Sequence, residues 1–399
     1  FGFTLMTTEI AIGRKTKLSP IKAYAKINKN YKFLGWLAFS VPVIILPYYC
    51  VIGGWVTKYI TVYITGQTAD AAQDGYFGGF IGKEYAPLVF FIIFLVLTSV
   101  IVILGVEKGI EKFSKVLMPL LIVLAAAISI YVCTIPGALD GVKYYLLPDF
   151  SKFSLKTVCA AMGQMFYSMS LAMGIMITYG SYTRDDVSLV KSVNQIEIFD
   201  TVIALLAGMM VIPAVYVFSG TEGMAQGPSL MFVSLPKVFA QMGKVGNVIG
   251  CLFFAMVLFA AFTSAVSVME AIVASIMDEF HTSRAKAGII ELIIAIIVGT
   301  IVCLGYNKLY FEVKLPNGSI AQILDIMDYI SNNIMMPIVA IGTCILIVWI
   351  SKPQTVIEEV QKNGEKFSRK GMYVVMVKFI TPILLFILFL KSIDLLTFI

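Results

Sequence analysis

Charge and histidine are scarce in this chain. Of its 399 residues only 14% are Asp, Glu, Lys or Arg, and His281 is the single histidine. Six cysteines occur, but no Cys-x-x-Cys pair is among them. This composition argues against a His/Cys metal site and against a disulfide framework. The sequence also contains no nucleophile–base arrangement and no phosphate-binding loop, so it does not predict an enzyme.

Apolar residues, by contrast, dominate the chain. They make up 59% of it, and the mean hydropathy is +0.90. A soluble domain cannot cover so much apolar surface, whereas a helix of about 20 apolar residues spans a bilayer. We therefore expect an all-α polytopic membrane protein, with residues 1–399 forming one domain. Ten hydrophobic segments are predicted, at 1–12, 33–57, 87–105, 116–135, 157–181, 197–219, 245–277, 287–304, 321–350 and 373–395.

The first segment has a different character from the others. Residues 1–12 do not begin with methionine and lead directly into the basic stretch "RKTK". No basic region precedes them, so they do not form a signal peptide. We interpret this segment as the second half of a membrane span and expect the sequence to be truncated at its N-terminus.

The basic residues predict the orientation in the membrane. If the loops alternate between sides, one side holds 19 of the 30 Lys and Arg residues. Short cytoplasmic loops carry such an excess. The prediction is a multi-pass protein of a bacterial plasma membrane, and its positive charge then reflects lipid headgroups, not nucleic acid. The cytoplasmic loops would be 13–32, 106–115, 182–192, 278–286 and 351–371.

Polar residues interrupt the segment 157–181 near its centre. Gln164, Ser168 and Ser170 lie there, between Gly163 and Gly174. Irregular backbone at membrane depth is tolerated where it lines a cavity inside the protein. Two half-helices with an unwound joint could then bind a cation and a carboxylate. The alternative is a continuous helix whose small residues permit close packing.

Further polar side chains lie inside other spans, where each is a functional hypothesis. Thr263 and Ser264, one turn after Ala260, offer hard oxygen ligands to Na⁺ or, alternatively, hydrogen bonds between helices. Asp200 is an isolated carboxylate near the start of its span and could instead lie at the membrane interface. The same two interpretations apply to the remaining acids, Glu9, Glu270, Asp278, Asp325 and Asp328.

Several motifs, taken in order along the chain, resemble those of the neurotransmitter:sodium symporter family. They are "EIAIGR", "YY" followed by "GGW", "GQMFYSMSLAMGIMITYGSY", "TSAVS" and "LDIMDY". The resemblance covers essentially the whole chain and is strongest to bacterial members of the leucine-transporter type. It implies the five-plus-five inverted-repeat transporter fold, here lacking span 1 and half of span 2.

The resemblance also implies an activity, which is sodium-coupled secondary active symport of hydrophobic or aromatic L-amino acids by alternating access. Two Na⁺ sites are implied, the first with Ser168 and Asp200, the second with Ala260, Thr263 and Ser264. A carboxylate at position 200 implies that chloride is not required. Both sites would be incomplete without span 1, so we expect this stretch alone not to transport.

Roles for further residues follow from the same resemblance. The gates would comprise Gln164, Tyr182, Asp278 and Asp328, although the arginine partners of both carboxylates belong to span 1. Glu9 would brace the unwound joint. Tyr49 would bind the substrate carboxylate. The substrate-binding residues would be Ile45, Tyr49, Tyr167, Ser168, Ser170, Met173, Ser264 and Val268.

The expected partners are a small-molecule amino acid and the lipid bilayer, and the oligomeric state is not predicted. Met173 beside Tyr49 and Tyr167 favours large apolar substrates, because methionine adapts to varied shapes. One alternative keeps the fold and replaces sodium coupling, giving a proton-coupled or exchanging amino-acid permease of a related superfamily. A channel would need a continuous polar pore lining, whereas the polar residues here are confined near the middle of the membrane.

Overall fold

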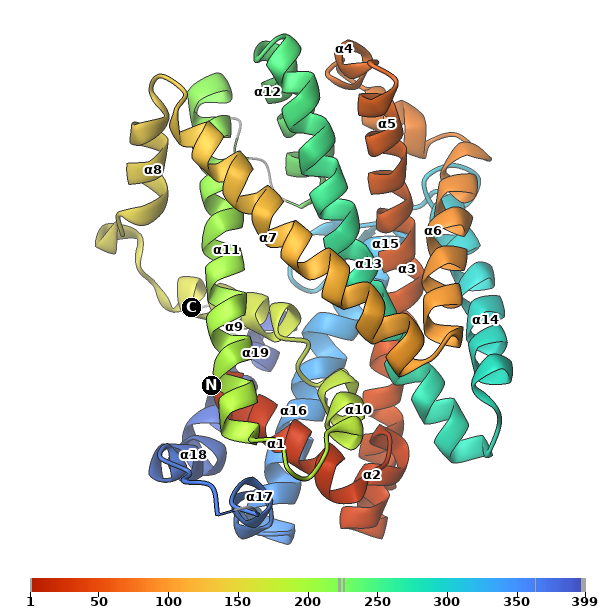
Figure 1. The fold of residues 1–399 in the computed structure, drawn as a ribbon, viewed down its shortest axis with the longest axis vertical. Coiled ribbons are helices and arrows are strands. Elements are labelled where there is room, and N and C mark those ends of the chain that lie inside the picture. Colours follow the sequence, from red (N-terminus) through yellow and green to blue (C-terminus); the bar gives the residue numbers. More distant parts are fainter. Residues whose placement is uncertain (1, 222–223, 225–226, 363, 396–399) are drawn as a thin grey trace.

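The computed structural model describes residues 2–221, 224, 227–362 and 364–395, and the described chain is almost entirely helical (Figure 1). The longer helices are α1 (Gly2–Thr16), α3 (Lys32–Ile64), α6 (Ala86–Ile103), α7 (Lys112–Cys133), α9 (Leu155–Ser168), α11 (Leu189–Ser219), α13 (Lys244–Phe280), α14 (Arg284–Leu304) and α19 (Thr381–Ser392). The shorter ones are α2 (Pro20–Ile27), α4 (Thr68–Ala71), α5 (Tyr76–Ile81), α8 (Ala138–Leu146), α10 (Ile175–Tyr182), α12 (Leu235–Gln241), α15 (Ile323–Asp328), α16 (Met336–Ile345), α17 (Gln354–Val360) and α18 (Lys370–Val375). A hairpin of β1 (Val313–Lys314) and β2 (Ile320–Ala321) is antiparallel.

Eight helical segments among the described residues are long and apolar enough to cross a membrane. They correspond to eight of the ten predicted hydrophobic segments. Most boundaries agree within a few residues, but three differ more: the segment of α3 ends at Ile64 instead of 57, that of α7 begins at Val106 instead of 116, and α11 begins at Leu189 instead of 197. The two remaining predicted segments are shorter helices. Residues 1–12 form most of α1, and residues 157–181 form the pair α9 and α10.

Serine residues begin several helices. The side chains of Ser154, Ser188 and Ser283 accept hydrogen bonds from backbone N–H groups in the first turns of α9, α11 and α14. Such caps satisfy donors that have no partner within the helix. These serines therefore set where each helix starts after a polar loop.

Helix α3 lies at the centre of the bundle and packs against α13, α6, α2 and α14. Helix α1 packs against α10 at very short range. A Cβ atom on Gly13 would lie 2.0 Å from the carbonyl oxygen of Ile177, and one on Gly180 would lie 2.4 Å from that of Ile10. The two backbones thus touch at positions that only glycine can occupy.

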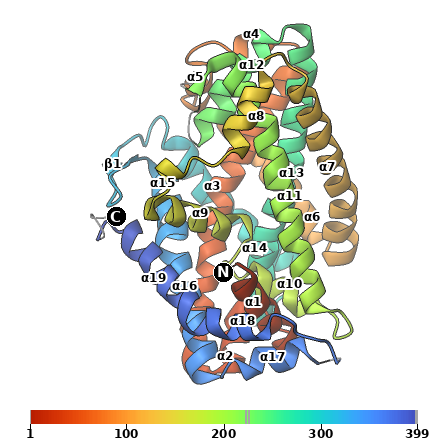
Figure 2. The same ribbon diagram turned by 90° about the vertical axis from the view of Figure 1, so that its left-hand side faces the viewer.

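The five loops predicted to be cytoplasmic meet at one end of the molecule. Lys362 of the last of these loops pairs with Asp185 at 2.8 Å, and Lys32 pairs with Glu279 at 2.6 Å. Arg284, at the start of α14, donates to the carbonyl of Val102 next to the loop 106–115. Helices α2, α17 and α10 lie at this end, whereas α4, α8 and α12 lie at the opposite one (Figures 1 and 2).

Candidate functional site

The helix break predicted for residues 157–181 is observed. Helix α9 ends at Ser168, and α10 begins at Ile175. Between them Ser170 and Ala172 have φ values of 52° and 60°, and Gly174 has 71°. A left-handed backbone conformation is energetically unfavourable for non-glycine residues. Such a joint therefore persists only where surrounding contacts stabilise it. The continuous-helix alternative is therefore wrong.

Glu9 of α1 lies against this joint. Its Oε1 accepts a hydrogen bond of 2.8 Å from the backbone N–H of Ala172, and the side chain is fully buried. The carboxyl group supplies an acceptor to an amide that the broken helix leaves without its usual carbonyl. Glu9 therefore lies where the resemblance implied a brace.

A cavity of about 320 Å³ lies beside the joint, between α3, α9 and α13. Tyr49, Tyr167 and Ala260 line it together with apolar side chains such as Val56 and Phe232. Its size and composition suit a small, largely apolar ligand with a few polar contacts. The Tyr49 side chain lies within interaction range of Ser264 of α13 and brings a hydroxyl group to an otherwise apolar wall.

A second cavity, of about 390 Å³, is lined by residues of α3, α9, α15, α16 and α19 and shares Tyr167 with the first. Gln164, Tyr48 and Asp328 line it. Asp328 accepts hydrogen bonds from the Tyr48 hydroxyl at 3.0 Å and from the amide of Asn332 at 2.6 Å. Two neutral donors therefore satisfy this carboxylate.

The residues proposed for the first sodium site lie together. The hydroxyl of Ser168, at the last turn of α9, donates to Oδ1 of Asp200 in α11. Both side chains are at least partly accessible. A hydroxyl and a carboxylate within hydrogen-bond distance are hard oxygen donors of the kind that small cations prefer.

The residues proposed for the second site share one turn of α13. The Thr263 hydroxyl donates to the carbonyl of Ala260 at 3.0 Å, and Ser264 is exposed next to it. The described residues contain no group of three or more His, Cys, Asp and Glu that could hold a metal ion. Any cation here would consequently depend on hydroxyl and carbonyl oxygens.

Not every predicted substrate residue reaches the cavity of Tyr49 and Tyr167. Ile45, Met173 and Val268 are buried but are not among the residues that line it. Ser170 lies in the unwound joint itself. Of the eight predicted substrate-binding residues, the two tyrosines therefore line this cavity, and the other six, Ser168 and Ser264 included, do not.

The two residues assigned to the inner gate, Tyr182 and Asp278, have separate partners in the structure. The Tyr182 hydroxyl donates to Oε1 of Glu270 at 2.5 Å. Glu270 in turn pairs with Arg284 at 2.5 Å. Asp278 accepts from the backbone N–H of Ser19 at 2.6 Å, so it has a partner, although not an arginine.

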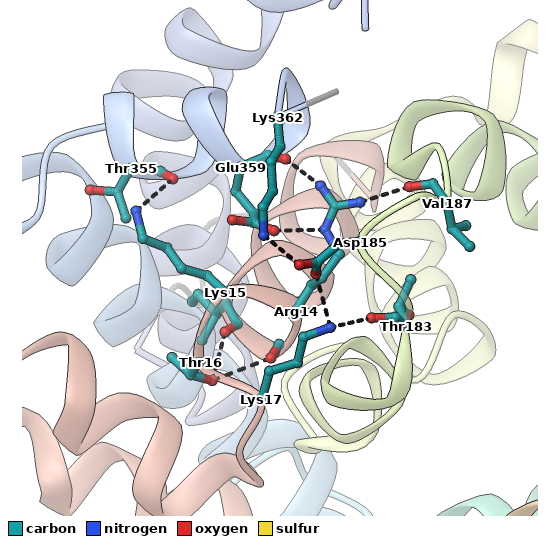
Figure 3. Close-up of polar contacts among 12 residues, drawn as sticks. Arg14, Lys15, Thr16, Lys17, Thr183, Asp185, Val187, Thr355, Glu359 and Lys362 are labelled. Carbon is teal, nitrogen blue, oxygen red and sulfur yellow. Dashed lines mark hydrogen bonds and ion pairs between the residues drawn. The ribbon is translucent and has the colours of Figure 1, made fainter. Parts of the chain in front are cut away.

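A second ionic cluster at the same end was not predicted from the sequence (Figure 3). Arg14 at the end of α1 is 1% exposed, and its Nε lies 2.7 Å from Oε1 of Glu359 in α17. The guanidinium also donates to the backbone carbonyls of Glu359 and Val187. Arg14 therefore ties α1 to the loop before α11 and to α17.

Lysines surround this buried pair at the surface. Asp185 pairs with Lys17 at 3.1 Å and with Lys362 at 2.8 Å, and these side chains are roughly half exposed (Figure 3). The hydrogen bonds from Lys362 and Lys17 lower the pKa of the Asp185 carboxyl to about 2. Arg14 belongs to the motif "EIAIGR", but nothing in the sequence predicted its partners, which lie more than 170 residues away.

Comparisons with known proteins agree with this arrangement. Residues 81–397 match the model of the sodium:neurotransmitter symporter family. An uncharacterized sodium-dependent transporter of Bacillus subtilis is 32% identical over 100% of this chain and 88% of its own length. A protein of the same description from Haemophilus influenzae is 30% identical over 98% of this chain and 87% of its own.

Among solved structures, the crystal structure of MhsT in complex with L-phenylalanine superposes with a TM-score of 0.87 at 33% identity. The match covers 98% of this chain and 88% of that one. These relatives are transporters, not enzymes, and the match extends over the broken helix and the central helix α3. The chain therefore belongs to the sodium:neurotransmitter symporter family, as a multi-pass membrane protein with the fold of these transporters.

Proposed function

We propose that the protein couples the movement of Na⁺ to the uptake of hydrophobic L-amino acids, with aromatic and branched side chains preferred. The observation that carries this proposal is the tyrosine-lined cavity next to the unwound joint between α9 and α10. The relative of known structure was crystallised with L-phenylalanine, an amino acid of this class.

The joint and the cavity divide the recognition of an amino acid between them. Backbone groups freed by the broken helix and the Tyr49 hydroxyl would bind the α-amino and α-carboxyl groups, which every substrate shares. Tyr167, Val56 and Phe232 would contact the side chain, which differs between substrates. A charged side chain would lose its hydration against this wall without gaining a partner, so we expect it to be excluded.

Sodium would bind at two places, one at Ser168 and Asp200 and the other at Ala260, Thr263 and Ser264. The Ser168–Asp200 hydrogen bond supports the first of these sites. Because Asp200 carries its own negative charge, no external anion is needed to balance the ion, and uptake should not depend on chloride.

The driving force of two ions would suffice for strong accumulation. Each Na⁺ that crosses about 100 mV yields roughly 2.3 kcal/mol. A tenfold concentration gradient adds about 1.4 kcal/mol per ion. Two ions together would supply on the order of 7 kcal/mol, or a concentration ratio of about 10⁵. The proposed location is a bacterial plasma membrane, with the end that carries Arg14 in the cytoplasm.

Uptake into proteoliposomes by the full-length gene product tests the proposal. Labelled L-phenylalanine, L-tryptophan and L-leucine are offered with external Na⁺, and then with K⁺ or choline in its place. The proposal expects accumulation only with Na⁺, unchanged when gluconate replaces chloride, and competition by hydrophobic but not charged amino acids. Accumulation driven by a proton gradient without Na⁺ would instead favour the proton-coupled permease.

A matched pair of tyrosine variants tests the role of the cavity. Tyr49→Phe removes a hydroxyl at the cavity wall and should raise the KM for amino acids. Tyr373→Phe removes a buried hydroxyl that bonds Thr8 at 2.8 Å, away from the cavity, and should leave KM unchanged. Equal KM values in both variants would contradict a role for Tyr49 in substrate binding.

A further inference from the structure

One buried carboxyl group lies outside both proposed sodium sites. Glu291 belongs to α14, and its side chain is 0% exposed. Neither carboxyl oxygen has a hydrogen-bond partner among the described residues. Helix α14 is one of the segments apolar enough to cross a membrane. The sequence analysis did not single out this residue, and nothing in the proposed transport cycle uses it.

Glu291 lies on the face of α14 that packs most tightly. The residues one or two turns away on this face are small, namely Ala287, Gly288, Ala295 and Gly299. A Cβ atom on Gly288 would lie 2.7 Å from Ile103 of α6, and one on Gly299 would lie 2.2 Å from the ring of Phe91. At positions 288 and 299, α14 therefore lies too close to α6 for any side chain larger than that of glycine.

The same contacts fix the register between α14 and α6. Residue 288 faces residue 103 and residue 299 faces residue 91, so the helices are antiparallel and Glu291 lies at the level of Ser99. Ser99 is 1% exposed, and its hydroxyl donates to the carbonyl of Leu95 at 2.8 Å. That hydroxyl oxygen can still accept a hydrogen bond.

No positive charge among the described residues faces Glu291. Helix α6 contains no ionisable side chain, and α3 contributes the buried thiol of Cys50, which lies within electrostatic range. Arg284 lies two turns away in the same helix, about 10 Å along its axis. Its guanidinium is bonded to Glu270 of α13 and to the carbonyl of Val102. Asp325 of α15 lies beyond the other end of α14, near Tyr306.

A carboxylate in these surroundings would be a buried charge with no counterion. Such groups take up a proton and become neutral, because burial penalises only the charged form heavily. The neutral acid keeps one O–H donor, and burying that neutral group costs far less than burying an unpaired charge. Glu270 differs from Glu291 in this respect. It is also buried, but it forms an ion pair with Arg284, which compensates a buried negative charge.

We propose that Glu291 is a proton-binding site of the helix scaffold, an uncharged carboxylic acid held between α14, α6 and α3 beside Ser99 and Cys50. The site is separate from the proposed sodium and substrate sites. Release of the proton needs water at the carboxyl oxygens, and therefore needs α6 and α14 to move apart. The proposal does not depend on which substrate the protein carries.

Infrared spectroscopy of the full-length protein in lipid at pH 7 tests this directly. The spectrum of wild type minus that of Glu291→Gln should contain the C=O stretching band of a protonated carboxylic acid. The matched difference for Glu270→Gln should contain carboxylate bands instead. A carboxylate difference at position 291, with no acid band, would overturn the proposal.

Unfolding measurements give a second readout that does not rely on spectra. Glu291→Gln resembles the neutral acid and should keep the wild-type unfolding midpoint, as should the apolar Glu291→Met. Glu270→Gln, which leaves Arg284 unpaired, should lower the midpoint. If Glu291 is instead an ionised ligand of a bound cation, Glu291→Gln will unfold earlier or fail to fold. The wild-type midpoint will then depend on the concentration of Na⁺ or K⁺. Either result contradicts the proposal.

Discussion

Replacing Arg14 by alanine should destabilise the protein more than any surface ion pair can. Arg14 and Glu359 have side chains that are 1% and 7% exposed, and 2.7 Å separates Nε from Oε1. The change would leave the buried Glu359 carboxylate without its ion-pair partner. It would also remove the donor to the carbonyl of Val187. Removing one partner of a buried ion pair costs about 3–5 kcal/mol, and we expect a loss of this size.

Lys17 supplies the matched control for Arg14. It lies three residues further along the chain and pairs with Asp185, but both side chains are about half exposed (Figure 3). Water and salt screen such a pair, so its contribution to stability is small. Lys17→Ala should therefore leave the unfolding free energy close to that of the wild type.

The assay is equilibrium unfolding of the purified protein in detergent, followed with a thiol-reactive fluorophore. Cys50, Cys159, Cys303 and Cys344 are buried and become reactive only when the helices separate. The variant Arg14→Ala/Glu359→Ala completes a double-mutant cycle. The double variant should lose less unfolding free energy than the two single variants lose together, by about 0.5–3 kcal/mol.

The reasoning would be refuted in either of two ways. One is an Arg14→Ala protein no less stable than Lys17→Ala. The other is a cycle in which the two single losses add without interaction. In both cases the close approach of α1 to α10 at Gly13 and Gly180, and not the ion pair, would hold α1 in place.

Three further predictions follow from the site and its surroundings. Ser168→Ala and Asp200→Asn should each weaken sodium binding roughly tenfold or more, measured as Na⁺-dependent binding of L-phenylalanine, whereas Thr201→Ala, beside Asp200, should not. The pKa of Asp185 is about 2 when folded, against an ordinary value of 3.8. Its contribution to stability should therefore be complete above about pH 4 and lost as the pH falls through 2, so the unfolding midpoints of wild type and Asp185→Asn should converge at low pH. Gly13→Ala would place a methyl group 2.0 Å from the carbonyl of Ile177, and should cost about 1–3 kcal/mol of unfolding free energy, whereas Gly371→Ala, with open space around it, should cost far less.

The hydrophobic segments and the helix break could be predicted from the sequence because each depends on residues that are neighbours in the chain. Apolar runs of membrane length predict the spans. The stretch "GQMFYSMSLAMG" concentrates glycine and hydroxyl residues at the middle of a span, where they do not favour a continuous helix. The resemblance to the family implied that Glu9 braces the joint, and Glu9 accepts a hydrogen bond there from the backbone N–H of Ala172.

The ionic contacts could not be predicted in the same way. Arg14 meets Glu359 across 345 residues, and which acid it selects depends on how α17 folds back on the bundle. Tyr182 was assigned to a gate together with Asp278, and its hydrogen bond to Glu270, two turns earlier in α13, could not be predicted. Glu291 carries no motif, and only the packing of α14 on α6 shows that its carboxyl is isolated.

Sodium dependence of amino-acid binding tests the central claim most directly. Equilibrium binding of labelled L-phenylalanine to the purified full-length protein would be measured in Na⁺ and in K⁺, for the wild type and for Asp200→Asn. The account predicts binding in Na⁺ alone, with a higher sodium requirement in Asp200→Asn. Equal binding in both salts, or a sodium requirement unchanged by Asp200→Asn, would contradict the sodium site between α9 and α11.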